Sequence, residues 1–379
     1  MQGNVSLVFL ITLALVFEYK SDIVYSIMNV RNYLLALCLF ALSTITSVKA
    51  QIKDTLTFAF TGDIMMGLNY PESTPMLPQE DGKLLFSDVA SILRRADIAF
   101  GNLEGVLLDK GGTPKHCSNP SICYTFRMPE RYAAHLVDAG YDVMSVANNH
   151  TNDFGTVGYL STMHVLEAHN IAFAGIRERC EKTIIERDGI KYGYCAFGHN
   201  TITVSIHDLA RVKEIVSFLK KECDIVIVSF HGGAEGATKN RIPFKQETFI
   251  GENRGDVHAF AHTCIDAGAD IVYGHGPHVV RAIELYKDHL IAYSLGNFCT
   301  PYKVNVRGNG GYAPVLEAKI DKNGRFLTGK IYSALQEHGQ GPHLDKKGIV
   351  VDEIRTLMQL DFPQTALSIK NDGTIVRTQ

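Results

Sequence analysis

Five short stretches of this sequence place metal-binding side chain types beside glycine or directly after an apolar run. They are the segments 62–63, 101–104, 148–150, 231–235 and 274–278. Carboxylate and amide oxygens and imidazole nitrogens are all ligands for divalent cations. A mixture of hard oxygen and borderline nitrogen ligands suits Mn, Fe or Zn better than Ca. One or two such ions would activate water for hydrolysis, so the pattern predicts a hydrolytic metal centre.

Each stretch also has a simpler interpretation when it is taken alone. A Gly-Asp pair after a strand is most often a turn, and an isolated His150 or His231 is most often a hydrogen-bonded structural residue. Pro277 would also simply end a strand. The recurrence of the pattern favours metal binding. Ten other histidines lack this context and are interpreted as surface or packing residues: His116, His135, His164, His169, His207, His258, His262, His289, His338 and His343.

The elements that must position these side chains alternate between strand-like and helix-like segments from residue 56 onward. The predicted strands are 56–61, 98–100, 141–147, 171–174, 225–230 and 271–273. The predicted helices are 85–95, 132–139, 159–169, 209–220, 257–267 and 349–360. Turn signals at 188–189, 287–288 and 323–324 predict hairpins and hence a second sheet. This alternation predicts an α/β fold with helices on the sheet faces and a site at the carboxyl ends of the strands.

The amino terminus carries export signals. Two apolar runs, 5–17 and 33–45, are both short for a spanning helix. The second follows a segment containing Arg31 and precedes a small-x-small pattern at Ala50, which is the order of a signal peptide beginning at Met28. Residues 1–50 are therefore predicted to be a signal peptide or an N-terminal membrane segment. The protein is predicted to be exported, and so periplasmic, on the cell surface, or anchored to the membrane facing outside.

Composition limits the classes of partner. The chain has 379 residues, is 46% hydrophobic and carries a formal charge of −3, which gives no electrostatic reason to expect nucleic acid. Most cysteines lie in apolar segments and none has zinc-knuckle spacing, so a thiol catalyst is not expected. Cys117 and Cys123 lie close together in a polar loop and could form a local disulfide in an oxidising compartment.

Several of these motifs together resemble those of the CapA family, the poly-γ-glutamate capsule synthesis proteins, whose domain is related to calcineurin-like metallophosphoesterases. The segments that carry the resemblance occur in family order: 62–65, 96–97, 101–104, 126–129, 147–155, 231–235, 274–278 and 294–298. The resemblance implies a four-layer α/β/β/α sandwich of the metallo-dependent phosphatase type over residues 55–300. Residues 301–379 are predicted to add a β-hairpin and a helix to the same domain.

The resemblance also implies a role for each site residue. The implied metal ligands are Asp63, Glu104, Asn149, His231 and His275. The implied catalytic residues are His150 and His278, the implied substrate contacts are Arg127 and Asn148, and Glu235 would orient a ligating histidine. Arg127 could equally form an ordinary salt bridge. Met65 stands where the phosphoesterases have a histidine, and His275 and His278 are one residue further apart than in those enzymes, so one or two ions remain open.

The site residues and the family resemblance predict two alternative functions. The first is an exported metal-dependent hydrolase that acts on a phosphoester, amide or related bond of an anionic cell-envelope polymer or another phosphorylated substrate. The second is a non-catalytic component of capsule assembly that binds or exports the polymer.

Overall fold

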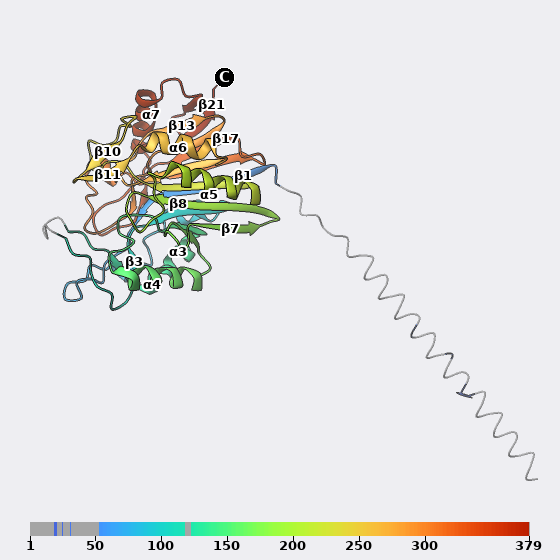
Figure 1. Ribbon diagram of the computed structural model, residues 1–379, viewed down its shortest axis with the longest axis horizontal. Coiled ribbons are helices and arrows are strands. Elements are labelled where there is room, and N and C mark those ends of the chain that lie inside the picture. The colour runs from blue at the N-terminus through green and yellow to red at the C-terminus, as the bar shows by residue number, and fades with distance from the viewer. Residues whose placement is uncertain (1–18, 21–24, 26–30, 32–52, 118–122, 379) are drawn as a thin grey trace, which may run out of the picture. The chain divides into compact units, whose positions relative to one another are not determined.

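The computed structural model describes residues 19–20, 25, 31, 53–117 and 123–378. The chain divides into two units, Met1–Gln51 and Ile52–Gln379. The predicted signal peptide or membrane segment, residues 1–50, lies outside the described residues apart from four positions. Among the described residues, no helix has the length and apolar character needed to span a bilayer. The second unit, Ile52–Gln379, contains all the strands of the described chain (Figure 1).

Within the described chain, the larger sheet has nine strands in the order β20-β21-β17-β16-β1-β2-β5-β6, with β15 also paired to β1. Their bounds are β1 Thr55–Ile64, β2 Ile98–Leu103, β5 Val143–Ser145, β6 Ala172–Ala174, β15 Asn297–Cys299, β16 Val315–Asp321, β17 Phe326–Tyr332, β20 Leu367–Ile369 and β21 Thr374–Arg377. Strands β1, β2, β5 and β6 run parallel. Strand β16 is antiparallel to β1, and the segment after residue 301 supplies four of the nine strands, β16, β17, β20 and β21.

The second sheet has six strands in the described part of the chain, in the order β13-β14-β12-β9-β8-β7. Their bounds are β7 Lys182–Arg187, β8 Ile190–Gly198, β9 Ile225–His231, β12 Ile271–His275, β13 Ile283–Tyr286 and β14 His289–Ala292. The strands from β14 to β8 are parallel to one another, and β7 and β13 close the edges as antiparallel hairpin partners. The predicted hairpins at 188–189 and 287–288 are therefore confirmed.

The two sheets pack face to face through aromatic side chains. Phe60 of β1 lies 4.8 Å from Tyr273 of β12 between ring centroids, and Phe100 of β2 lies 5.5 Å from Tyr194 of β8. All four rings are fully buried. Aromatic pairs at this spacing add specific contacts to the area that they bury, so this layer is the main core of the unit.

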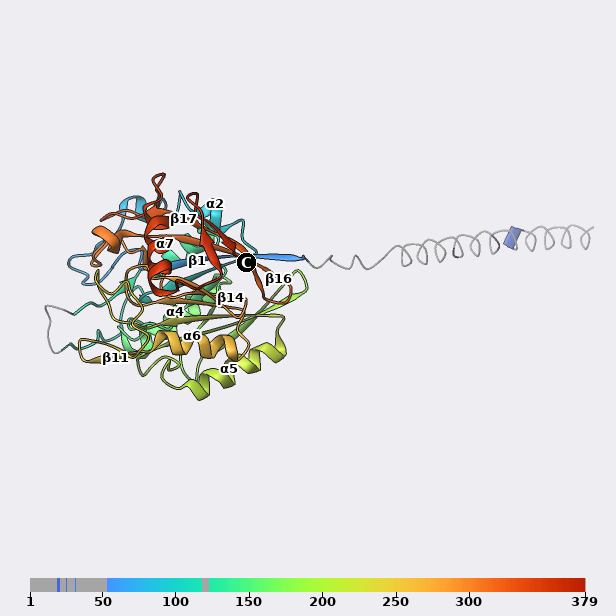
Figure 2. The same ribbon diagram turned by 90° about the horizontal axis from the view of Figure 1, so that it is seen from above.

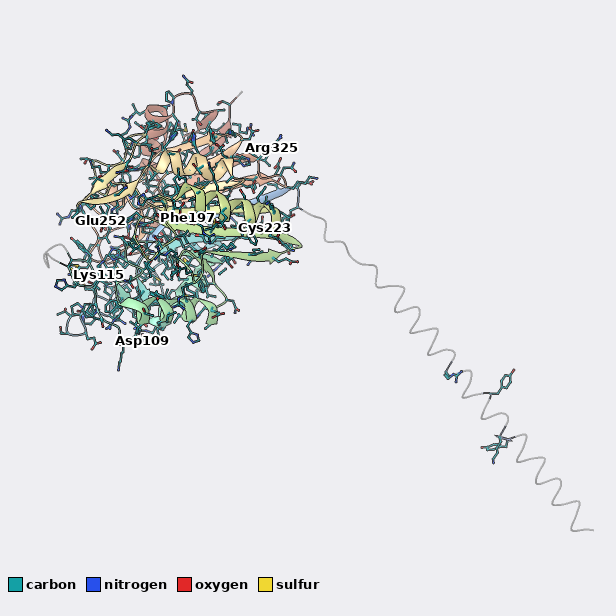
Figure 3. The ribbon with its side chains drawn as sticks, viewed as in Figure 1. Asp109, Lys115, Phe197, Cys223, Glu252 and Arg325 are labelled. Atoms are coloured by element: carbon teal, nitrogen blue, oxygen red, sulfur yellow. A yellow bond between two sulfur atoms is a disulfide. The ribbon has the colours of Figure 1, made fainter. Side chains whose placement is uncertain are left out.

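Helices cover the outer faces of both sheets. Helices α5 (Leu209–Glu222) and α6 (Val257–Asp266) pack on the six-stranded sheet (Figure 2). Phe197 of β8, labelled in Figure 3, contacts Phe260 of α6. The other outer layer consists of α2 (Ala90–Leu93), α3 (Ala133–Ala139) and α4 (Gly155–Ala168), with a further helix α7 (Ile349–Asp361) against β13 and β20. The predicted four-layer α/β/β/α sandwich is confirmed.

One predicted helix is mostly wrong. Of the segment 85–95 only α2 is helical, because residues 83–89 form successive four-residue turns, in which Leu85 N–H donates to Gly82 O and Ser87 N–H donates to Leu84 O. Leu85 and Val89 are nevertheless buried, so the apolar spacing that predicted a helix is satisfied by turns.

Several short elements were not predicted. The short strands are β3 Val106–Leu107, β4 Arg127–Met128, β10 Glu247–Phe249, β11 Glu252–Gly255, β18 Ala334–Leu335 and β19 His343–Leu344. The short 3₁₀ turns are Gln79–Gly82, Glu130–Tyr132 and Gly308–Gly311.

Candidate metal centre

The end of β1 sets the position of the first carboxylate. Asp63 pairs in register with Asn102 of β2, and its backbone N–H donates to Gly296 O at 2.9 Å. A Cβ atom on the preceding Gly62 would lie 2.0 Å from Gly296 O, so only glycine permits this approach. The end of β1 is thereby held against the segment that leads into β15, and the Asp63 side chain is fully buried.

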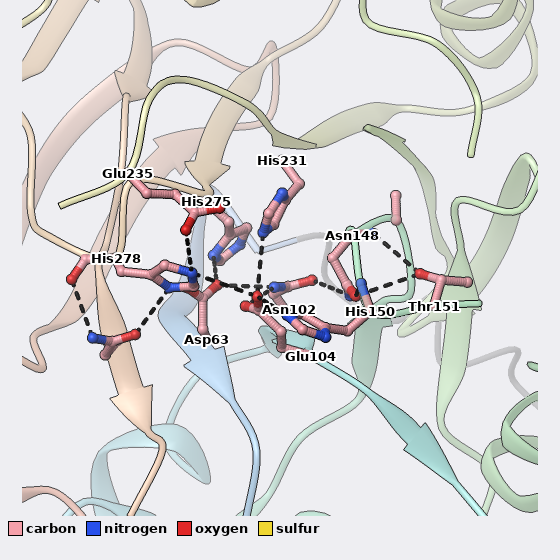
Figure 4. A network of polar contacts seen from close by, with 12 residues as sticks. Asp63, Asn102, Glu104, Asn148, His150, Thr151, His231, Glu235, His275 and His278 are labelled. Atoms are coloured by element: carbon pink, nitrogen blue, oxygen red, sulfur yellow. Dashed lines mark hydrogen bonds and ion pairs between the residues drawn. The ribbon is translucent and has the colours of Figure 1, made fainter. Parts of the chain in front are cut away.

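Strands β9 and β12 deliver two histidines to the same place. His231 and His275 are register partners at the ends of these neighbouring parallel strands, and both are fully buried. His275 Nδ1 lies 3.2 Å from Asp63 Oδ1 without hydrogen-bond alignment, and His231 Nε2 lies 3.6 Å from Glu104 Oε1. Figure 4 shows both rings directed at the two carboxylates.

His278 completes this group from the loop after β12. The backbone of His278 has a φ of 58°, an unusual value for a residue with a side chain, and Asn297 Nδ2 donates to the His278 carbonyl at 3.1 Å. His278 Nδ1 lies 3.0 Å from Asp63 Oδ2, and Nε2 lies 3.8 Å from Glu104 Oε1. Asp63, Glu104 and His278 each offer a ligand atom, and these atoms lie within 4.8 Å of one another.

The polar atoms of this cluster fit a divalent cation. Among the described residues, no hydrogen-bond partner contacts Glu104 Oε1 or either ring nitrogen of His231 and His275, although all are buried. Asn149 Oδ1, in the segment after β5, is likewise buried without a partner in the described chain, and its role as a ligand stays a prediction. Each buried polar group left without a partner costs about 1–3 kcal/mol. Such a concentration of unpaired acceptors and imidazoles is what a bound cation would satisfy, so the donor set fits a metal ion.

The two carboxylates differ in their protonation. Burial opposes ionisation of Asp63, but the close imidazoles of His275 and His278 outweigh it and hold the pKa of Asp63 well below its ordinary value. Burial and the charge of Asp63 both raise the pKa of Glu104 well above its ordinary value. Burial lowers the pKa of His278, but the charges of Glu104 and Asp63 outweigh the effect of burial and raise the pKa to about 10. Two neighbouring carboxylates thus attract positive charge into this pocket.

Side-chain amides connect the carboxylates to the segment after β5. Asn102 Nδ2 donates to Asp63 Oδ1 at 2.9 Å, and Asn148 Nδ2 donates to Asn102 Oδ1 at 3.1 Å and to Leu103 O at 2.8 Å. Asn148 Oδ1 accepts from the backbone N–H of His150 at 3.1 Å (Figure 4). The amide of Asn148 therefore positions its neighbours, and its predicted contact with substrate stays a prediction.

His150 is held by a carboxylate of its own. Its Nδ1 lies 2.7 Å from Asp153 Oδ2, and its ring stacks on Phe126 with centroids 4.0 Å apart. Lys115 Nζ lies 2.6 Å from the other oxygen of Asp153. Burial lowers the pKa of His150, which favours the neutral ring. With Nδ1–H donated to Asp153, Nε2 points to the cluster 3.9 Å from Glu104 Oε1 and is available for proton exchange.

Two predicted residues lie at the margin of the cluster or outside it. Arg127 is buried and donates from Nε to Asn69 Oδ1 at 2.8 Å and from its terminal nitrogen to Glu72 at 3.0 Å. Its predicted contact with substrate is untested. Glu235 Oε2 lies 3.8 Å from His278 Nε2, while its other oxygen lies 2.7 Å from Arg254.

Sequence reasoning assigned no role to four residues that build the site, namely Asn102, Asp153, Asn297 and Arg254. The first three lie inside motifs that were recognised, so an amide or carboxylate within such a motif was the available signal.

Met65 is fully buried in the apolar core beneath the outer helices, which explains why it offers no ligand. Cys117 and Cys123 form the disulfide that the sequence allowed.

The family of the chain follows from a comparison with known proteins. The family described as "Bacterial capsule synthesis protein PGA_cap" matches residues 57–302. The chain belongs to the PGA_cap family. This match confirms the resemblance inferred from the motifs, and the PGA_cap region contains every residue of the cluster.

Individual relatives of this PGA_cap protein are distant. It is 27% identical over 274 residues to "Capsule biosynthesis protein CapA" of Bacillus anthracis, covering 67% of this chain and 62% of that relative. It is 28% identical over 266 residues to "PGA biosynthesis protein CapA" of Bacillus subtilis (strain 168), covering 66% of this chain and 65% of that relative. The matched region thus spans less than two thirds of either relative. A solved phosphatase from Mycoplasma pneumoniae is 13% identical with a TM-score of 0.46, over 76% of this chain and 96% of that one.

Proposed function

We propose that this protein is an exported metal-dependent hydrolase that cleaves a phosphoester, amide or related bond in an anionic cell-envelope polymer. The observation that carries the proposal is the cluster of Asp63, Glu104, His231, His275 and His278, in which Glu104 Oε1 and both ring nitrogens of His231 and His275 are buried without a hydrogen-bond partner among the residues that the structure describes. Membership of the PGA_cap family, and the names of the CapA relatives, support a capsule polymer as the substrate class.

The side chains of the cluster divide the work of such a reaction. Asp63, Glu104, Asn149, His231 and His275 would hold the ion, together with His278. A divalent ion supplies Lewis-acid chemistry, which lowers the pKa of water and polarises an acyl or phosphoryl oxygen.

His150 is placed to move a proton at Nε2. Because Asp153 accepts the Nδ1 proton, the neutral ring presents its Nε2 lone pair to the pocket and can be protonated there as charge develops on the substrate. Asn102 and Asn148 hold the carboxylate and the His150 backbone in place, so the geometry is fixed before substrate binds.

A second function, binding of an anionic polymer without cleavage, is favoured by one observation. Met65 lies in the apolar core where a two-ion phosphoesterase would have a ligand. A site that holds one ion could anchor carboxylate or phosphate groups of a polymer for assembly or export.

The two functions are separated by one set of measurements on the full chain. Bound Mn, Fe and Zn are quantified by elemental analysis, and hydrolysis of p-nitrophenyl phosphate and of a γ-glutamyl polymer is measured before and after chelation. The hydrolase requires bound metal and turnover that is lost in Asp63→Asn and retained in His207→Ala, a histidine exposed on the surface. Metal-free protein that binds polymer equally well with and without Asp63→Asn would overturn the hydrolase.

A further inference from the structure

A second cluster of metal-binding side chains lies on α6 and β13 and shares no residue with the first. His258 and His262 occupy positions four apart on α6, so their rings project from the same face of the helix. Glu284 lies on β13, and its two carboxylate oxygens are 3.1 and 3.0 Å from His262 Nε2. One ligand atom from each of the three residues lies within 4.8 Å of the others.

Neighbouring aromatic rings fix the orientation of both imidazoles. The His262 ring stacks on Tyr286 with centroids 3.7 Å apart, and the His258 ring lies 4.0 Å from the His262 ring. Phe362 stacks on the other side of this group, 6.1 Å from His258. Because these rings are held by packing, their nitrogens are presented to the same point with little loss of side-chain freedom on binding.

The carboxylate is fixed in the same way. Tyr293 Oη donates to Glu284 Oε2 at 2.7 Å, which is the kind of outer hydrogen bond that orients a ligating carboxylate. The Glu284 side chain is 11% exposed and that of His262 is 22% exposed. The cluster is therefore largely buried at the carboxylate and open to solvent at the histidines.

We propose that His258, His262 and Glu284 form a Zn²⁺ site. Two imidazoles four residues apart on one helix face, joined by a carboxylate, form a three-ligand set suited to zinc. Nitrogen donors disfavour Ca²⁺ and Mg²⁺, which take oxygen ligands. The solvent-facing side leaves room for water as a fourth ligand and a path for the ion to enter.

An ion bound at this site would connect an outer helix to the edge of a sheet. An ion at this point cross-links α6 to β13, the edge strand of the six-stranded sheet, beside the segment that follows α7. Zinc would therefore stabilise the contact between an outer helix and the sheet edge, independently of the cluster at the end of β1.

The test measures zinc bound by the full chain at equilibrium. Dialysis against a range of Zn²⁺ concentrations, followed by elemental analysis, is carried out in an Asp63→Asn background and in the parent protein, so that the two clusters are counted separately. His258→Ala, His262→Ala and Glu284→Gln are each compared with His207→Ala. We expect His258→Ala and His262→Ala each to lose one equivalent of zinc, whereas His207→Ala keeps it. The loss of affinity should be at least about 100-fold, because removing a ligand costs more than the roughly 10–100-fold of removing a partner that only orients one. Unchanged stoichiometry and affinity in His258→Ala and His262→Ala would overturn the proposal.

A second measurement needs no variant at this cluster, in case the substitutions unfold the protein. The full-length Asp63→Asn protein is treated with diethyl pyrocarbonate with and without Zn²⁺, and modified histidines are located by fragment-ion mass spectrometry. Zinc is expected to protect His258 and His262 and to leave His207 equally reactive. If zinc leaves the modification of His258 and His262 unchanged, as it does for His207, the His262–Glu284 contact is a hydrogen bond only and the proposal is overturned. Because the readout is local, its failure would leave the function proposed for the first cluster unaffected.

Discussion

Removing the carboxylate of Glu247 is expected to destabilise the protein and to disturb the loop that follows His231. Glu247 accepts two hydrogen bonds from Arg281, both at 2.8 Å, and a third from the backbone N–H of Ala234 at 3.0 Å. The Arg281 and Glu247 side chains are 0% and 6% exposed. Arg281 also donates from Nε to Lys239 O, so the pair holds the loop from two sides.

The magnitude follows from the burial of the pair. Glu247→Ala leaves a guanidinium without its counter-charge in the interior, which costs about 3–5 kcal/mol. The second unit spans Ile52–Gln379. With an unfolding entropy of roughly 2.1 cal/mol/K per residue, a cost of about 4 kcal/mol lowers Tm by about 6 °C.

The assay is thermal and urea unfolding of the full chain, followed by circular dichroism, with bound metal measured in parallel. Glu72→Ala is the matched control, because Glu72 pairs with the buried Arg127 but its side chain is 69% exposed, and about 1 kcal/mol or less is expected. The double variant Glu247→Leu with Arg281→Met is expected to recover more than half of the loss, since no buried charge remains. If Glu247→Ala costs no more than Glu72→Ala, the reasoning from burial is refuted.

Three further outcomes are expected. Asp153→Asn should lower turnover by about 10–100-fold, because His150 loses the carboxylate that fixes its ring. The metal content of the variant should equal that of the parent protein, and a loss of metal that parallels the loss of turnover would contradict this role. Gly62→Ala should destabilise by about 3 kcal/mol or more in urea unfolding, since its Cβ would overlap the rigid carbonyl of Gly296, and a Tm within about 2 °C of the parent would disprove the overlap. Burial raises the pKa of the Cys264 thiol, so mass spectrometry should find it unalkylated by iodoacetamide in folded protein and alkylated after denaturation, and rapid labelling in the folded state would count against its burial.

The sequence predicted the layers of the fold because hydrophobic periodicity and turn chemistry agree along most of the chain. The helix predicted over 132–139 ends where expected, because Gly140 directly after it adopts a φ of 100° and ends α3. The segment 83–89 shows the limit of this reasoning. Leu85 and Val89 are buried at helical spacing, yet the backbone satisfies its hydrogen bonds through turns, and periodicity alone does not distinguish the two.

The cluster at the strand ends could be predicted in outline for a related reason. Parallel strands present their carboxyl ends at one edge, and glycine next to a polar residue marks each such end. The pairing of Asn148 with Asn102, and of His150 with Asp153, depends on the register of β2 and β5 and on the start of α4, which no single motif specifies. The spacing of His258 and His262 can be seen in the sequence. Glu284 becomes a neighbour of His262 only through the packing of α6 on β13.

The antiparallel pairing of β16 with β1 has a practical meaning for anyone who trims this protein to its recognised region. Seven residues of β1, from Thr55 to Thr61, are paired with residues 315–321. A fragment that stops at residue 302 would leave the backbone N–H and C=O groups of β1 that pair with β16 without partners. An apolar strand exposed in this way tends to pair with strands of other molecules, which causes precipitation. The chain beyond the family boundary is therefore needed for a soluble, monodisperse preparation.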